Sequence, residues 1–275
     1  MFYTSAGTIP FLPPENRVAH CGCSKLFRGE AAAFLVCWIA TLCVFQSRAF
    51  MDPGALWHVK VGDIILDTGY FPRTDPFTFP FEGKPWIPQQ WGGEVLMALA
   101  HKAAGLDGML FAFSSLVAGF FTWVFSRLRA GGMKWPFAFT AASLAFVAAA
   151  FHFFARPHLA TIGMVGLTMA WIIEFDRQRI GLNRFALLIP LYIVWTNVHG
   201  GTFGGCMMLG CAAIAWGAGF LWKWESPLKS WRSVWLLALI LAGCGLSVLV
   251  NPFGLELLRT WQRILGSTAM KEVVA

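Results

Sequence analysis

Long apolar runs with almost no charged side chains dominate this chain of 275 residues. About 20 helical residues cross the ~30 Å hydrocarbon core of a membrane, whereas the strands of a membrane barrel alternate polar and apolar positions over about ten residues. The runs here are continuous, which favours helices. The pattern predicts an all-α, polytopic membrane protein with about seven transmembrane helices, at residues 31–51, 106–126, 135–155, 157–175, 185–203, 203–222 and 233–250.

Composition supports this interpretation and narrows the classes of function. Hydrophobic residues make up 57% of the chain, charged residues make up 13%, and the mean hydropathy is +0.61. In an ordinary soluble domain, charged residues form about a quarter of the chain. The net charge of +7 comes from small groups of Lys and Arg between the apolar runs. No basic cluster is interleaved with aromatic residues, so we expect no nucleic-acid partner.

The basic residues also predict the orientation of the chain. Of the 21 Lys and Arg residues, 12 lie before the first span or in the loops on the same side of the membrane. These are Arg17, Lys25, Arg28, Arg127, Arg129, Lys134, Arg177, Arg179, Arg184, Lys223, Lys229 and Arg232. By the positive-inside rule, the N-terminus is cytoplasmic, the C-terminus is external, and the first span is a retained anchor.

These boundaries divide the chain into three segments. Residues 1–30 form a cytoplasmic N-terminal segment, residues 31–250 form a transmembrane module that includes an external loop at 52–105, and residues 251–275 form an external amphipathic segment. The odd number of spans leaves open whether the chain is a fragment of a longer protein.

Polar residues that are costly at membrane depth gather in the external turns. Four turns carry a charged, imidazole or amide group beside Gly or Pro: Asp52-Pro53, Arg156-Pro157-His158, Asn197-Val198-His199-Gly200-Gly201 and Asn251-Pro252-Phe253-Gly254. In the fifth run, only residues 185–196 lack strongly polar side chains, and they cover about 18 Å as a helix. Asn197 and His199 therefore either line a cavity open to the external side or belong to a tight Gly-Gly turn that His199 caps.

The long external loop begins with the pattern of an interfacial helix. Asp52 suits its N-cap, Pro53 its first position and Gly69 its end. One face carries Lys60, Asp63 and Asp67, and the other carries Trp57, Val61, Ile64 and Ile65. We expect this helix to lie parallel to the membrane and to cover the cavity. Asp52 is then either a helix cap alone or also a base that takes a proton from an acceptor.

Other polar residues of this region have simpler interpretations beside a functional one. Asp75-Pro76 is read first as an Asx turn and second as part of a site. His58, Glu94 and His101 lie in helical runs, where packing at the interface is their simplest role.

The external loop resembles that of the GT-C superfamily of integral-membrane glycosyltransferases. The resemblance rests on Asp52-Pro53, His58, Pro72-Arg73-Thr74-Asp75-Pro76-Phe77-Thr78, Gly83 and Trp86. This superfamily includes oligosaccharyltransferase catalytic subunits and protein O-mannosyltransferases. The three later turns resemble a bacterial branch of the same group, which implies a location in the bacterial plasma (inner) membrane.

The resemblance implies transfer of a sugar from a polyprenyl-phosphate carrier to an acceptor on the external side. Asp52 would be the catalytic residue, because the acidic residue after the first span acts at the acceptor in that group. The donor phosphate would be bound by Arg156, His158 and His199. Candidate acceptor-binding or cavity-lining residues are His58, Asp75, Asn197 and Asn251. The alternative function is a non-catalytic membrane carrier, lipid flippase or assembly subunit that uses the same polar cavity.

The resemblance leaves the cofactor open. Oligosaccharyltransferases hold a divalent metal through acidic residues of the first and second external loops, but the second external turn here contains no carboxylate. Asp52 alone would offer too few oxygen ligands for a hard cation. No cofactor is therefore predicted with certainty, and the metal ligands are unknown.

Overall fold

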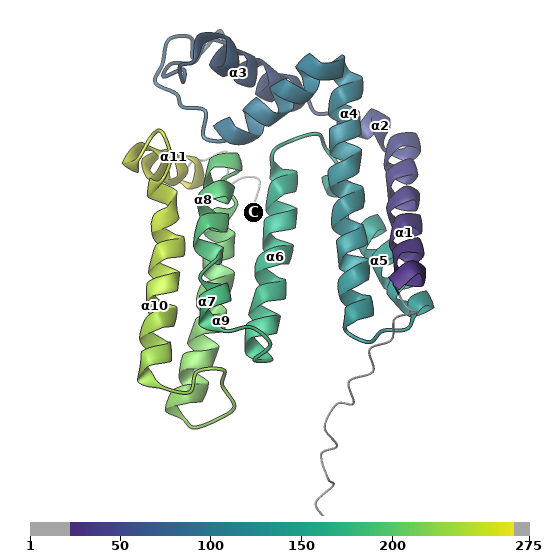
Figure 1. Cartoon of the computed structure of the whole chain (residues 1–275). Coiled ribbons are helices and arrows are strands. Elements are labelled where there is room, and N and C mark those ends of the chain that lie inside the picture. The colour runs from purple at the N-terminus through teal and green to yellow at the C-terminus, as the bar shows by residue number, and fades with distance from the viewer. Residues whose placement is uncertain (1–22, 267–275) are drawn as a thin grey trace, which may run out of the picture.

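The computed structural model describes residues 23–266, and they form a helical protein (Figure 1). Within this range there is no β-strand, and two isolated β-bridges, Thr74–Pro85 and Asp75–Glu82, lie in the long loop. The predicted all-α class is therefore confirmed. Residues 1–22 and 267–275, which belong to the predicted terminal segments, lie outside the described residues.

Eleven α-helices and two short 3₁₀ helices follow one another along the described chain. They are α1 (Cys23–Val44), α2 (Gln46–Ala49), α3 (Gly54–Thr68), α4 (Trp91–Ala130), α5 (Trp135–Ala149), η1 (Ala150–His152), α6 (His158–Asp176), α7 (Leu182–Phe185), α8 (Leu188–Val198), α9 (Thr202–Leu221), α10 (Trp231–Leu246), η2 (Ser247–Leu249) and α11 (Leu255–Leu265).

Five helices of the described range are long and apolar enough to cross a membrane. They cover Trp91–Ala130, Trp135–His152, His158–Asp176, Thr202–Leu221 and Trp231–Leu249. Two shorter apolar helical stretches, Gly29–Val44 and Leu182–Val198, accompany them. Helices of this length and composition identify the chain as an integral membrane protein.

Local backbone geometry explains where several helices begin and end. Gly69 ends α3 as predicted, because it adopts the left-handed conformation with φ of 70°. Helix α4 is broken at Ala104 and Gly105, directly before the predicted second span. Two predicted boundaries are wrong. The first span does not run to residue 51, because Phe45 leaves the helical conformation, and the fifth does not reach residue 203, because His199 is extended with φ of −160°.

The membrane helices form two bundles that stand side by side (Figure 1). In the first bundle, α1, α4 and α5 pack around aromatic side chains, and the ring centroids of Phe121, Phe146 and Phe153 lie between 5.1 and 6.1 Å apart. In the second bundle, α6, α8, α9 and α10 pack around the fully buried Tyr192 and Trp195. Few contacts join α4 to α6, so the bundles face each other along these two helices.

A layer of shorter segments crosses one end of both bundles, which we call the α3 end (Figure 1). Helix α3 packs on the first part of α4 through Gly62, where a Cβ atom would lie 2.1 Å from the carbonyl oxygen of Glu94. Helix α11 packs on the long loop through Leu257, which is buried with Ile87 and Phe253. Helix α3 therefore lies at the end of the transmembrane helices, and its expected position over a cavity stays a prediction.

Candidate functional site

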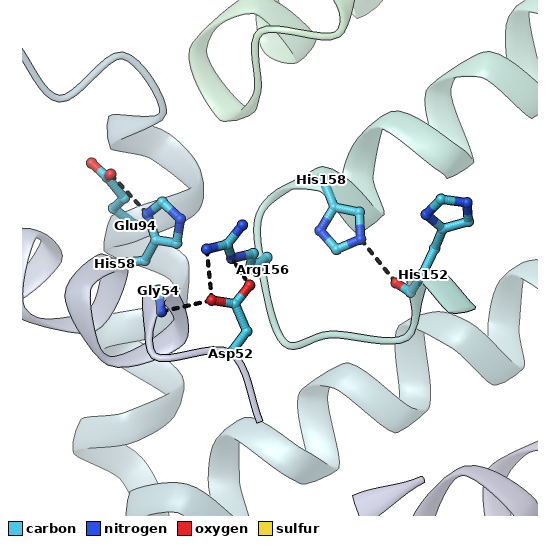
Figure 2. Close-up of polar contacts among 7 residues, drawn as sticks. All are labelled: Asp52, Gly54, His58, Glu94, His152, Arg156 and His158. Carbon is cyan, nitrogen blue, oxygen red and sulfur yellow. Dashed lines mark hydrogen bonds and ion pairs between the residues drawn. The ribbon is translucent and has the colours of Figure 1, made fainter. Parts of the chain in front are cut away.

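Asp52 and Arg156 meet at the α3 end although 104 residues separate them in the sequence. Arg156 Nη2 donates to Asp52 Oδ1 over 2.7 Å, and Arg156 Nε lies 2.6 Å from Asp52 Oδ2 (Figure 2). The first contact is a hydrogen bond and the second is an ion-pair distance alone, because Arg156 Nε has no hydrogen-bond partner among the described residues. Asp52 Oδ1 also accepts a hydrogen bond of 2.8 Å from the backbone N–H of Gly54, the first residue of α3. The N-cap position itself is Pro53, one residue later than predicted, and it has no side-chain cap.

Two glycines allow the turn between α5 and α6 to approach the other elements this closely. A Cβ atom at Gly54 would lie 2.0 Å from Arg156 Nη2, so any larger residue there would displace the guanidinium. At Gly93, a Cβ atom would lie 2.6 Å from the Cβ of Pro157. The first contact places Arg156 on α3, and the second holds the same turn against α4.

A second polar pair joins His58 of α3 to Glu94 of α4, on the face of α3 that also contacts Arg156. His58 Nδ1 is 3.0 Å from Glu94 Oε1, and Glu94 is only 2% exposed. His58 follows Gly54 by four residues, which places it one helical turn from the Arg156 contact. The sequence-based interpretation of both residues as simple packing missed this pair. The sequence did carry a signal for this pair. Glu94 is a carboxylate within an apolar run, directly after Gly92-Gly93, and a carboxylate that is buried in such a run needs a polar partner.

His158 and His199 are each oriented by hydrogen bonds, with ring centroids 6.5 Å apart. His158 Nε2 donates to the carbonyl of His152 over 2.9 Å, so its buried Nδ1 is an acceptor, without a partner among residues 23–266. His199 Nδ1 accepts from the N–H of Gly201 over 3.1 Å and lies 2.8 Å from Thr161 Oγ1. The proton of His199 is therefore on Nε2, and its ring caps the Gly-Gly turn, one of the two roles that we expected.

The surroundings of His199 keep its imidazole neutral. Burial lowers the pKa of His199 to about 4, and repulsion from the protonated forms of His158 and His58 and from Arg156 acts in the same direction. At neutral pH His199 therefore supplies an N–H donor and no positive charge. Of the three residues predicted to bind the donor phosphate, Arg156 is the one with a permanent charge.

Asp75 is held within its own turn. Its carboxylate accepts hydrogen bonds from the N–H of Phe77 (2.8 Å), the N–H of Thr78 (3.1 Å) and the hydroxyl of Thr78 (2.5 Å). The predicted Asx turn is therefore confirmed. The Thr78 hydroxyl and the two backbone N–H groups lower the pKa of Asp75, because they stabilise its charged form. The structure does not connect Asp75 to Asp52 or Arg156 by any hydrogen bond.

Asn197 and Asn251 also use their side chains to hold the chain together. Asn197 accepts from the indole N–H of Trp91 over 2.7 Å and donates to the carbonyl of Val250 over 2.8 Å, which ties α8 to α4 and to the end of η2. Asn251 donates to the carbonyl of Val248 and accepts from the N–H of Phe253 over 2.7 Å. The four polar turns therefore do not form one constellation. Asp52 and Arg156 are brought together, and Asn251 serves a turn of its own.

Arg156 also lies at the head of an apolar groove between α4 and α6. A cavity of about 130 Å³ is lined by Arg156 and by residues such as Gly93, Met97 and Val198. A second cavity of about 430 Å³ continues along α4 and α6 to Trp123 and is lined entirely by apolar residues. The two share Leu96, Leu116, Leu159, Ala160 and Val198, so they form one path, which we call the α4–α6 groove.

The described residues offer little for a metal ion. No group of three His, Cys, Asp or Glu side chains between residues 23 and 266 lies close enough together to hold one. The two carboxylates nearest the groove, Asp52 and Glu94, each already have a partner, in Arg156 and His58. Metal dependence stays an open prediction.

Comparisons of the chain with protein-family models, with curated proteins and with solved structures found no match.

Proposed function

We propose that this protein binds a sugar carried on a polyprenyl phosphate and transfers the sugar to an acceptor at the α3 end. The observation that carries the proposal is the position of Arg156, the one charged residue among those that line the α4–α6 groove in the described chain. Such a groove suits a ligand with a single anionic group at one end and a long apolar tail. A polyprenyl phosphate has this chemistry.

The dimensions of the groove support this ligand. Leu159 and Leu167 mark its extent on α6, and eight residues of helix correspond to about 12 Å. That length reaches close to half-way through the ~30 Å hydrocarbon core. The volumes of about 130 and 430 Å³ together lie in the range of small-molecule sites.

Arg156 keeps donors for a phosphate while it is held by Asp52. A guanidinium has five N–H donors; Nη2 donates to Asp52, and Nε lies 2.6 Å from Asp52 Oδ2 without a hydrogen bond. Within residues 23–266, Nη1 makes no hydrogen bond and is available to the ligand. Asp52 therefore acts first as a positioning residue for Arg156.

Asp52 is also the proposed base. In the transfer step, the acceptor oxygen forms a bond to the anomeric carbon of the sugar while the bond from that carbon to the phosphate oxygen breaks. The phosphate leaves with the electron pair and is stabilised by Arg156, and Asp52 takes the acceptor proton. Both Asp52 oxygens contact Arg156 here. The step thus requires Oδ2 to exchange that contact for the acceptor hydroxyl.

The proposal includes a membrane topology. α1 and the α7–α8 pair would be the two shorter crossings beside the five long ones, which makes seven spans. The loops that join α4 to α5, α6 to α7 and α9 to α10 all lie at the end opposite α3 (Figure 1). These loops and the helix ends beside them carry most of the described basic residues that predict the cytoplasmic side, so the α3 end would face outward from a bacterial plasma membrane.

A transfer assay with a radiolabelled polyprenyl-phosphate sugar tests the proposal in detergent micelles. Arg156→Ala should weaken donor affinity by roughly 10- to 100-fold, because it removes hydrogen bonds to a charged group. Asp52→Asn should abolish transfer and retain donor binding within a few-fold. Arg73→Ala is the matched control, because Arg73 lies at the same end, is 53% exposed, pairs with Glu256 and lines neither cavity.

Two results would contradict parts of the proposal. Transfer that is unchanged in Asp52→Asn would remove the base assignment. If Arg156→Ala weakens acceptor binding but spares donor affinity, the phosphate role of Arg156 is wrong. Tight binding of polyprenyl phosphate without transfer of any sugar would favour the alternative of a carrier or flippase.

A further inference from the structure

A third cavity, of about 460 Å³, opens between α4 and α6 at the end of the bundles opposite α3. It adjoins the α4–α6 groove at Trp123, which lines both. Its inner wall is apolar, with Val124, Leu128, Met169 and Ile173. Its rim is charged. The charged residues of this cavity therefore lie at the end opposite α3, whereas the one charged residue of the groove, Arg156, lies at the α3 end.

The rim of this cavity carries three guanidinium groups and one carboxylate. Glu174 Oε1 lies 2.5 Å from Arg127 Nη2 and 3.4 Å from Arg179 Nη1, so one carboxylate is shared by two arginines. The side chain of Arg177 is exposed and has no hydrogen-bond partner among residues 23–266. The rim therefore has a net charge of +2 at neutral pH.

We propose that this cavity is a binding site for an anionic phospholipid of the leaflet at that end. The headgroup phosphate would contact Arg177 and Arg179, whose planar guanidinium groups suit phosphate oxygens. The acyl chains would lie along Met169 and Ile173 toward Trp123. A basic rim over an apolar wall between two transmembrane helices is complementary to this class of lipid. A zwitterionic lipid has no net charge to match, and a free anion would leave the apolar wall exposed to water.

The site is independent of the proposed transfer activity. Its residues lie at the opposite end of α4 and α6 from Arg156, and only Trp123 is common to the cavity and the groove. Lipid binding here can therefore be measured with no sugar donor present.

Native mass spectrometry of the delipidated full-length chain tests the proposal directly. We expect dioleoyl-phosphatidylglycerol to form stoichiometric adducts at concentrations where dioleoyl-phosphatidylcholine does not. The double variant R177A/R179A should weaken phosphatidylglycerol binding by roughly 30-fold, since each basic residue contributes close to fivefold. Met169→Trp should also weaken it by filling the apolar wall.

The matched control is the double variant R184A/R232A. It removes two exposed basic residues at the same end of the bundles, outside the cavity and without hydrogen-bond partners among the described side chains. It should bind phosphatidylglycerol like the wild type. Size-exclusion elution and helical circular dichroism check that every variant is folded.

Three results would overturn the proposal. An equal loss in R184A/R232A would mean that only the general surface charge attracts the lipid. Equal binding of the two lipids would show that the rim does not select the headgroup. If 10 mM inorganic phosphate displaces the lipid from wild type and Met169→Trp binds normally, the cavity is a free-anion site.

Discussion

At the scale of single residues, Asp52 serves the backbone and the site at the same time. Its carboxylate accepts a hydrogen bond from Gly54, the first residue of α3, and forms an ion pair with Arg156. The contact with the backbone of α3 and the proposed role at the acceptor would therefore fall on one side chain. Arg156 in turn depends on Gly54, because a Cβ atom there would occupy the position of its Nη2.

His199 predicts a pH dependence of stability at the same scale. Its pKa is about 4 in the folded protein, whereas an ordinary histidine titrates near 6.5. Between these values the unfolded chain binds more protons, so the contribution of neutral His199 is complete above pH 6.5 and is lost as the pH falls toward 4. The largest possible effect is about 3 kcal/mol. The melting temperature of wild type in detergent should fall more than that of His199→Gln between pH 7 and pH 5.

His199→Gln is the non-titrating reference, since glutamine can still accept hydrogen bonds from Thr161 and Gly201 and cannot take up a proton. The other acidic and basic groups titrate in both proteins. Parallel pH profiles of the two proteins would show that His199 is not the group responsible.

At the scale of elements, the break in α4 changes the direction of this helix between the layer at the α3 end and the first bundle. Gly105 has φ of 59° and ψ of −144°, a conformation that is essentially restricted to glycine. The segment before it carries Glu94 toward His58 and Lys102 to within 2.5 Å of Asp67. The segment after it crosses the membrane. The break at Ala104 and Gly105 therefore separates the part of α4 that contacts α3 from the long apolar part.

Gly105→Ala should destabilise the protein by about 1–3 kcal/mol, because alanine is strained in that conformation. The melting temperature in detergent measures this cost. Gly119→Ala, in the regular part of the same helix, is the control, since its Cβ would meet no atom within 4 Å and alanine favours helix over glycine. If the melting temperature of Gly105→Ala falls no more than that of Gly119→Ala, the break does not need glycine.

At the scale of the whole molecule, the two bundles leave an apolar groove between α4 and α6, and the first part of α4 lines it at the α3 end. The groove exists because α6 packs on α8 and α9 and makes few contacts with α4. Each bundle has its own core, so the space between them can hold a ligand without loss of either core.

Ala160→Trp tests the groove, because Ala160 lines both of its cavities. A tryptophan there should reduce binding of a polyprenyl phosphate by at least tenfold, measured by competition with a labelled analogue, and leave the elution volume unchanged. Ile214→Trp is the control, as Ile214 on α9 is 74% exposed and lines neither cavity. Normal binding by Ala160→Trp would place the lipid elsewhere.

The sequence by itself determined the features that depend on neighbours along the chain. Apolar runs specify most of the membrane helices, Gly69 ends α3, Asp52 accepts a hydrogen bond from the first residue of α3, and Asp75 forms its own turn. Each follows from hydrogen bonds within a few residues or from the match between helix length and bilayer thickness.

The tertiary structure alone decided which polar residues meet. The Asp52–Arg156 and His58–Glu94 pairs join residues 104 and 36 positions apart. Asn251, which like Asp52 and Arg156 is a polar residue directly before a proline, makes its side-chain hydrogen bonds within its own turn. The sequence pattern does not distinguish the residues that pair over a long distance from Asn251, because pairing depends on how closely two helices approach each other. That approach is set by glycines such as Gly54 and Gly93, whose missing Cβ atoms make room for a residue from another element.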